Sequence, residues 1–280
     1  MALPPQPDRP NSTMADLVEA PGPDLSAWFT TPPGQYLLGW EQACFDQAVV
    51  DLFGYNALQL GLPELQTLAA NRMPHRWLAA PEAAVWAAPP DLVTHAAALP
   101  FQAQTLDLVT LPHTLELSAD PHEVLREVER VLVPEGRVVV SGLNPTSLWG
   151  WRQQRAHWCR RVGWQTGPGQ LFLPEAGDFI GHWRLRDWLR LLGFEVEVLR
   201  LGCYRPAVDS DKWLQRFEWM DRVGPRWWPV LGAVYFVVAV KRVRGMRLLG
   251  PAWKPRRVAA APVAVVQRPS VGAMTGDPSA

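Results

Sequence analysis

Two short apolar runs near the middle of the chain, residues 106–111 and 137–141, predict buried strands. Their sequences, LDLVTL and RVVVS, hold few polar side chains, as strands buried on both faces of a parallel sheet do. Between them, residues 121–132 carry apolar side chains at helical spacing, so one face of a helix is expected to be buried. These apolar positions are Val124, Leu125, Val128, Val131 and Leu132. Strand, helix and strand in this order predict a right-handed βαβ unit.

The ends of that helix are marked in the sequence. Asp120 can accept hydrogen bonds from the first turn, Pro121 needs no hydrogen-bond partner at the first helical position, and Glu123 completes a capping box. The tripeptide Pro134-Glu135-Gly136 ends the helix. Ligands of open α/β sheets bind outside the carboxyl ends of the strands, so Leu111–Glu116 and Ser141–Pro145 are the candidate ligand segments.

Other apolar patterns extend this unit on both sides. Residues 33–53 predict a helix whose buried stripe consists of Tyr36, Leu37, Trp40, Ala43, Cys44, Gln47, Ala48 and Leu52. A strand is expected near residues 56–60, and a closing helix near 184–192. Two further strands are expected near 194–200 and 230–240.

The chain is expected to hold one folded domain, residues 25–243, between two disordered ends. Residues 1–24 contain six prolines and no apolar segment, which predicts disorder and no secretory signal. Residues 244–280 form a basic tail rich in Ala and Pro, also expected to be disordered. Residues 146–183 resemble an insertion or lid within the domain.

Composition excludes several classes of function. The formal net charge is zero, so no general attraction to nucleic acid or membranes is expected. The three cysteines Cys44, Cys159 and Cys203 lie far apart, which argues against a zinc site or a disulfide framework and favours the cytoplasm. The longest apolar run, Trp227–Val240, is too short to span a bilayer. No membrane or metal partner is therefore expected.

Several segments of the later half form one pattern: LPF at 99–101, LDLV at 106–109, HTLE at 113–116, LREVERVLVPEGRVVVSG at 125–142 and the helix-strand-strand ending. This pattern resembles the class I methyltransferases that depend on S-adenosylmethionine (SAM), in the type 11 family and its YafS-like members. This resemblance implies a Rossmann-like α/β fold over about residues 35–242. Its sheet has seven strands, mostly parallel and flanked by helices, in the order 3-2-1-4-5-7-6 with strand 7 antiparallel.

The half that holds the cofactor in this family departs from the family pattern. An acid and then Gly-x-Gly-x-Gly follow the first strand of the family, whereas here Gln59 takes the acid position and only Gly61 keeps a glycine. Pro63 and Leu65 replace the other two glycines, and proline has no backbone N–H. Glu82 is the nearest acid for the ribose hydroxyls, and His95 occupies the position of the acid that contacts adenine.

The resemblance still implies a SAM site in this region. Its expected residues are Gln59, Gly61, Leu62, Pro63, Glu82, His95, Ala96, Leu111 and Pro112. His113 follows strand 4 and is a weak candidate for a catalytic base, with a capping or packing role as the alternative. The leading hypothesis is SAM-dependent methyl transfer to an unidentified small-molecule or macromolecular acceptor. The alternative, favoured by the altered glycine loop, is a catalytically silent binding or regulatory protein with an eroded SAM site.

The insertion carries tryptophans among arginines. Leu148, Trp151, Trp158 and Val162 share one face of a helix, and this face is expected to pack as a lid on the core. The second hypothesis is a surface for RNA or an anionic substrate, which combines aromatic stacking with positive charge. The arginines that it would use are Arg152, Arg155, Arg160 and Arg161.

Overall fold

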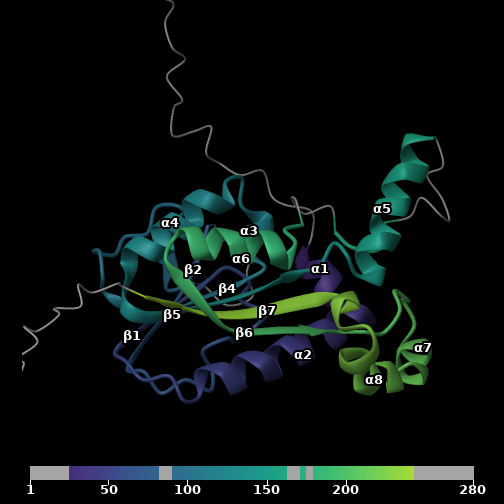
Figure 1. Ribbon diagram of the computed structural model, residues 1–280, viewed down its shortest axis with the longest axis horizontal. Coiled ribbons are helices and arrows are strands. Elements are labelled where there is room, and N and C mark those ends of the chain that lie inside the picture. Colours follow the sequence, from purple (N-terminus) through teal and green to yellow (C-terminus); the bar gives the residue numbers. More distant parts are fainter. Residues whose placement is uncertain (1–24, 82–89, 163–170, 175–178, 243–280) are drawn as a thin grey trace, which may run out of the picture. The chain divides into compact units, whose positions relative to one another are not determined.

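The computed structural model describes residues 25–81, 90–162, 171–174 and 179–242. These residues form one seven-stranded sheet with the order β3-β2-β1-β4-β5-β7-β6 (Figure 1). The strands are β1 (Asn56–Leu60), β2 (His75–Ala80), β3 (Leu92–Val93), β4 (Leu106–Pro112), β5 (Leu132–Leu143), β6 (Phe194–Gly202) and β7 (Val234–Lys241). Only β7 runs antiparallel to its neighbours, β5 and β6. Both the order and the antiparallel strand confirm the predicted fold class.

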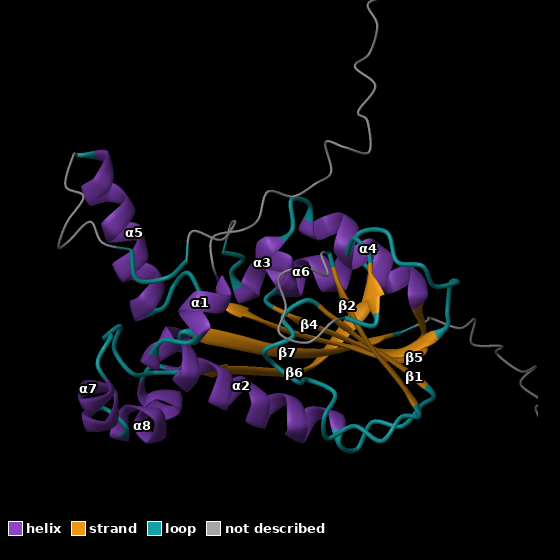
Figure 2. Cartoon of the chain, turned by 180° about the vertical axis from the view of Figure 1, so that it is seen from behind, coloured by secondary structure: helices purple, strands orange, loops and turns teal. Residues whose placement is uncertain are grey.

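Helices cover both faces of the sheet (Figure 2). They are α1 (Leu25–Phe29), α2 (Pro32–Val49), α3 (Thr114–Leu117), α4 (Pro121–Val131), α5 (Leu148–Arg161), α6 (His182–Leu191), α7 (Asp211–Arg216) and α8 (Trp219–Trp227), with a 3₁₀ turn at Pro229–Leu231. Helix α2 packs on one face, where the Phe45 ring meets that of Phe236 on β7 at 5.0 Å. Helices α3, α4 and α6 bury their apolar side chains against the other face.

Helix α4 and its flanking strands form as predicted. The Asp120 carboxylate accepts hydrogen bonds from the backbone N–H groups of His122 (2.9 Å) and Glu123 (3.1 Å). The predicted apolar face is fully buried. Strand β5 starts at Leu132, five residues earlier than predicted, because Leu132 already pairs with Leu106 on β4. Residues 133–136 form an irregularity within the strand, before regular pairing resumes at Arg137.

The buried face of α2 differs from the predicted stripe. Ala43 and Gln47 are exposed, whereas Glu41 and Phe45, which the stripe does not include, are buried. Glu41 lies on the buried face because its partner, His113, belongs to a distant part of the chain. The spacing of apolar residues within a helix cannot reveal a partner that is so distant in the sequence.

The predicted buried face of α5 is wrong in three of its four residues; the fourth, Leu148, is partly buried against the core. Trp151, Trp158 and Val162 are exposed, and the helix instead buries the face of Trp149, Gln153, Ala156 and Cys159. Long-range hydrogen bonds fix this rotation: Trp149 Nε1 donates to the Arg205 carbonyl at 2.8 Å, and the Gln153 amide bonds the backbone of residues 172–173.

Among the described residues, two connections in the early half of the sheet lack the helix that a doubly wound fold normally carries there. The connections 61–74 and 94–105, both fully described, contain turns and no helix. A parallel crossover usually holds a helix, whose N-terminus offers free N–H groups to ligands. The loop after β1 therefore lacks this means of holding an anionic or polar ligand.

The predictions for residues 1–24 and 244–280 lie outside the described residues, and the domain and insertion boundaries stay predictions. None of the described helices has the length and apolar content needed to cross a membrane. Within the described ranges, no group of three or more His, Cys, Asp or Glu side chains is placed to hold a metal ion.

Candidate active site

The carboxyl ends of β1, β2 and β3 border a small hollow, here called the β1–β3 hollow. Its volume is about 70 Å³. Its lining consists of Leu60, Gly61, Leu62, Ala79, Ala80, Pro81, Thr94, His95, Ala96, Thr114, Leu117 and Ser118. This is the edge at which open α/β sheets bind ligands. Small-molecule sites usually have about 300–1,000 Å³, so a cofactor of the size of SAM needs the hollow to widen.

Gln59, at the position of the family acid, holds the loop after β1 together. Its side-chain N–H₂ donates to the carbonyls of Leu62 (3.0 Å) and Leu65 (2.6 Å). Its side-chain oxygen accepts from the backbone N–H and the hydroxyl of Thr67, at 3.0 and 2.8 Å. The Thr67 hydroxyl lies 2.6 Å from that of Thr110 on β4. Because the amide bonds carbonyls as well as donors, a carboxylate cannot replace it in this network.

Further hydrogen bonds within the chain involve backbone N–H and carbonyl groups at the end of β1 and in the loop after it. The backbone N–H of Gly61 donates to the Ala79 carbonyl at 2.7 Å, and that of Leu65 to the Leu62 carbonyl at 3.2 Å. The Thr114 hydroxyl donates to the carbonyl at the end of β1, that of Leu60, at 2.6 Å. Gly61 does keep the left-handed backbone (φ 73°) that suits a tight ligand turn. The amides of Gly61 and Leu65 are nevertheless not free for a ligand.

His95 lines the hollow, as the resemblance implies, but it offers a ligand a hydrogen-bond donor where the acid of the family offers an acceptor. Its Nδ1 accepts from the backbone N–H of Ala97 at 3.3 Å. A neutral ring whose Nδ1 accepts carries its proton on Nε2, so that the free nitrogen is a donor. The acid of the family accepts a hydrogen bond from the adenine amino group, whereas His95 can offer a donor to a ring nitrogen.

The lining residues thus fit SAM in part. Leu60, Ala79, Ala80, Ala96 and Leu117 offer an apolar wall for a base, and His95 offers one donor. No carboxylate lines the hollow among the described residues, so a partner for the ribose hydroxyls is missing there. Glu82, the predicted partner, lies outside the described residues.

The other predicted cofactor residues divide into two groups. Leu62 and Ala96 line the hollow, whereas Pro63 does not. Leu111 and Pro112 are buried at the end of β4 and do not line it either. The structure therefore brings together Gly61, Leu62, His95 and Ala96, with Gln59 behind them in the loop.

His113, the predicted base, is buried between two carboxylates. Its Nε2 lies 3.0 Å from Oε1 of Glu41 on α2, and its Nδ1 lies 3.2 Å from Oε2 of Glu116 on α3. The other oxygen of Glu116 accepts from the backbone N–H of Leu143 at the end of β5. The cluster ties α2, the end of β4 and the end of β5 together.

This environment fixes the charge of His113. Burial disfavours the charged ring, but the carboxylates of Glu41 and Glu116 outweigh it and raise the pKa of His113 to about 10. The ring is therefore protonated at neutral pH, and only 1% of it is exposed. A buried imidazolium can neither reach a substrate nor accept its proton, so the geometry suits the packing role.

Sequence reasoning missed Glu41 as the partner of His113. A weak signal existed: Leu37, Glu41 and Phe45 are spaced four residues apart, so a charged residue stands in an apolar row of α2. An acid in such a row needs a buried partner, but the sequence does not say which one.

The basic insertion is only partly available for ligands. The Arg152 guanidinium donates to the Ala207 carbonyl, lies 3.5 Å from Asp209 and sits 4.4 Å from the centre of the Phe172 ring. These contacts give Arg152 a structural role. Arg155 is exposed, whereas the side chains of Arg160 and Arg161 lie outside the described residues. The RNA hypothesis, with its four arginines, stays a prediction.

Comparison with known proteins agrees with the predicted resemblance. Residues 68–140 match the profile of the type 11 methyltransferase family, described as a methyltransferase domain. A 100-residue stretch is 39% identical to "Uncharacterized protein YafS" of Escherichia coli (strain K12), and covers 35% of this chain and 36% of that protein. The match thus spans about a third of the length of this relative.

Solved structures show the same fold. A SAM-dependent methyltransferase of Thermotoga maritima aligns with a TM-score of 0.50 and 16% identity, over 78% of this chain and 94% of that one. A chain from the complex between the Haloferax volcanii Trm112 methyltransferase activator and a methyltransferase aligns with a TM-score of 0.51 and 17% identity, over 80% and 100%. At such low identity, the likeness concerns the fold alone.

Proposed function

We propose that this chain, which has a type 11 methyltransferase-domain match and the class I methyltransferase fold, performs SAM-dependent methyl transfer through a weakened cofactor site. The observation that carries the proposal is the position of the β1–β3 hollow. It lies at the carboxyl ends of the strands where this fold binds its ligands, beside a glycine turn that keeps a positive φ.

The residues of the hollow would each contribute to binding. Ala79, Ala96 and Leu117 would pack on the adenine, the turn at Gly61 would allow close approach, and His95 would donate a hydrogen bond. When bound, SAM supplies an electrophilic methyl group. Since His113 is buried and protonated, the chain would act mainly by holding the acceptor in line and close to that group.

The altered groups predict a weak cofactor site. A missing amide donor at Pro63 costs roughly 0.5–1.5 kcal/mol, and a missing ribose carboxylate roughly 1.5–3 kcal/mol. Each 1.4 kcal/mol is about a factor of ten, so a site that would be micromolar moves to about millimolar.

The second candidate function is a catalytically silent protein that keeps the sheet as a binding scaffold. The Gln59 network favours it, because its hydrogen bonds stabilise the loop in a form with a small hollow, in which the backbone amides of Gly61 and Leu65 already have partners within the chain. The acceptor, the RNA hypothesis and the cytoplasmic location are predictions in either case.

A hollow-filling variant tests the proposal. S-adenosylhomocysteine at millimolar concentration should give saturation-transfer NMR signals from its adenine protons with the wild-type chain. Ala96→Phe should abolish them, because Ala96 lines the hollow. Ala98→Phe is the matched control, since Ala98 is exposed in the same loop and does not line the hollow. Signals that survive Ala96→Phe would overturn the proposed position of the site, and signals that never appear would favour the silent scaffold.

A further inference from the structure

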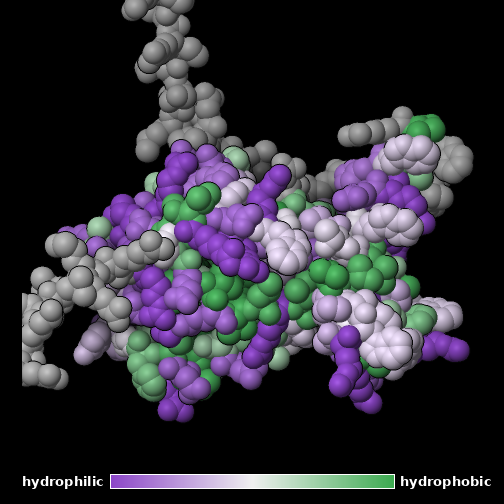
Figure 3. Space-filling model, viewed as in Figure 1, coloured by the Kyte–Doolittle hydropathy of each residue, from purple (hydrophilic) through white to green (hydrophobic). Residues whose placement is uncertain are grey.

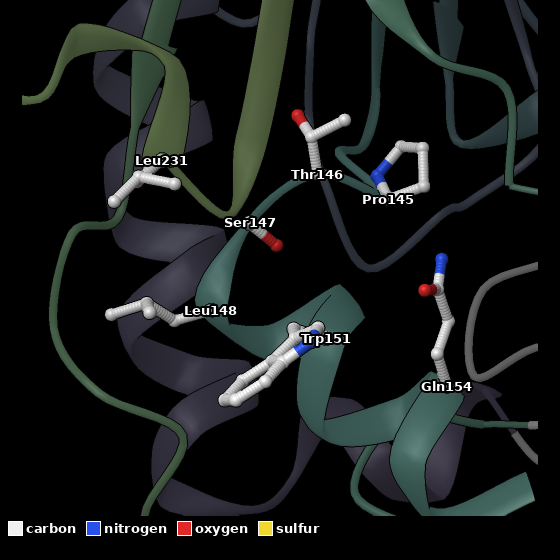
Figure 4. A pocket seen from close by; sticks show the side chains of 7 residues that line it. All are labelled: Pro145, Thr146, Ser147, Leu148, Trp151, Gln154 and Leu231. Carbon is white, nitrogen blue, oxygen red and sulfur yellow. The ribbon is translucent and has the colours of Figure 1, made fainter. Parts of the chain in front are cut away.

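We propose that a second cavity, at the carboxyl end of β5, is a binding site for a small, neutral aromatic molecule. This cavity, here called the Trp151 pocket, has a volume of about 370 Å³ and is lined by Pro145, Thr146, Ser147, Leu148, Trp151, Gln154 and Leu231 (Figure 4). Its size falls in the range of small-molecule sites, about 300–1,000 Å³.

The walls of the Trp151 pocket are held by a network centred on Asn144. The side-chain N–H₂ of Asn144 donates to the carbonyls of Val230 and Gly232, both at 2.9 Å, and so fixes the turn that carries Leu231. Its side-chain oxygen accepts from the hydroxyl of Thr146 at 2.7 Å. One buried amide thus positions two lining residues of the cavity, Thr146 and Leu231.

Helix α5 supplies the floor, and it too is firmly placed. A Cβ on Gly150 would lie 2.4 Å from the Pro145 carbonyl oxygen, so the helix approaches that wall as closely as a glycine allows. One residue earlier, the buried Trp149 anchors the helix to the Arg205 carbonyl. A cavity between elements fixed in this way is preformed, which lowers the entropic cost of binding.

The chemistry of the lining defines the ligand class. No lining residue carries a charge, and Pro145, Leu148 and Leu231 make apolar walls. The Trp151 ring is 66% exposed, and neither it nor the Gln154 amide has a hydrogen-bond partner among the described residues. Figure 4 shows the indole between the leucines and the Gln154 amide. An exposed indole offers a stacking face, and a free amide offers a donor and an acceptor to a flat, neutral, weakly polar ring.

The Trp151 pocket is separate from the β1–β3 hollow, and no residue lines both. In the sheet order, β4 stands between the strands of the hollow and β5. The inference therefore does not depend on whether SAM binds.

Fluorine NMR of 5-fluoroindole tests this proposal on the full chain. The wild type should broaden the ¹⁹F signal at millimolar or lower concentration. Trp151→Ala should weaken binding roughly tenfold, the upper range of a lost aromatic pair. Trp158→Ala is the matched control: Trp158 lies on the same helix, is 65% exposed and does not line the pocket. Indole-3-acetate, which adds a carboxylate, should bind more weakly because the pocket offers no cation.

Three results would overturn the proposal. They are no broadening with the wild type, equal binding by Trp151→Ala, and equal losses in Trp151→Ala and Trp158→Ala. Since Trp151 is exposed, its replacement should leave the circular dichroism spectrum unchanged. Gln154→Leu gives a second readout, because it removes the free amide while keeping an apolar wall, and should weaken 5-fluoroindole binding severalfold.

Discussion

Single residues decide how far the cofactor site departs from its family. The resemblance marks Gln59 as a lost acid. The structure gives this residue a role of its own, because its side-chain amide bonds three carbonyls and two donor groups in the loop after β1. The sequence predicted that the acid was missing. It could not predict the network, because the partners Leu62, Leu65 and Thr67 become visible only when the loop is folded.

Restoring the family acid should therefore harm the protein. Gln59→Glu removes the N–H₂ donor and sets a carboxylate against the carbonyls of Leu62 and Leu65. Two buried acceptors left unpaired should lower the free energy of unfolding by about 1–3 kcal/mol or more. Urea denaturation measures this, with Gln215→Glu on the exposed side of α7 as the control. A stable Gln59→Glu protein that binds SAM more tightly would refute the structural role of Gln59.

The His113 cluster predicts a dependence of stability on pH. The pKa of His113 is raised to about 10 in the folded chain and is about 6.5 when unfolded. Stability from this group is thus fully present below about pH 6.5 and is lost as pH rises towards 10. Urea denaturation should show a decline of a few kcal/mol over this range, since one pKa unit is about 1.4 kcal/mol.

NMR provides the independent check on His113. Its ring proton resonance should not titrate between pH 5 and about 9. A normal titration of His113 near pH 6.5 would show that the pairs with Glu41 and Glu116 do not hold in solution.

At the scale of elements, the sequence predicted those helices and strands whose caps and apolar faces are encoded by neighbouring residues. Helix α4 is predictable because its cap, its first-turn proline and its apolar face are all encoded within twelve residues. The predicted face of α5 is wrong in most of its residues and that of α2 is incomplete, for a common reason. Glu41 finds its partner in His113, and Trp149 finds its own at Arg205. Counting apolar side chains cannot detect these distant hydrogen-bond and ionic partners.

The corrected face of α5 predicts opposite effects for two tryptophans. Trp149→Phe leaves the Arg205 carbonyl without its donor and shrinks a fully buried side chain, so it should destabilise the chain by about 1–3 kcal/mol. Trp158→Phe, on the exposed face, should change stability by less than about 0.5 kcal/mol. Urea denaturation of both variants measures the difference. The opposite order would restore the face predicted from the sequence.

At the scale of the molecule, tryptophans gather on the surface near the carboxyl edge of the sheet. Trp213, Trp219 and Trp227 on α7 and α8 are exposed, like Trp151 and Trp158 on α5. Figure 3 shows side chains of intermediate hydropathy over α5 and over α7 and α8. The sequence predicted the seven-stranded fold because its later half keeps the family pattern. It did not predict that the connections 61–74 and 94–105 contain no helix, since the loss of a family motif does not reveal which structure replaces it.

Calorimetric titration of SAM into the full chain tests the central claim, a class I fold with a weakened cofactor site. The account predicts a dissociation constant of about 1 mM, two to three orders of magnitude above a micromolar site. Low-micromolar binding would contradict it and mean that the hollow opens readily and that residues such as Glu82 supply the missing contacts. No heat of binding at millimolar SAM would contradict the transferase proposal and leave the silent scaffold.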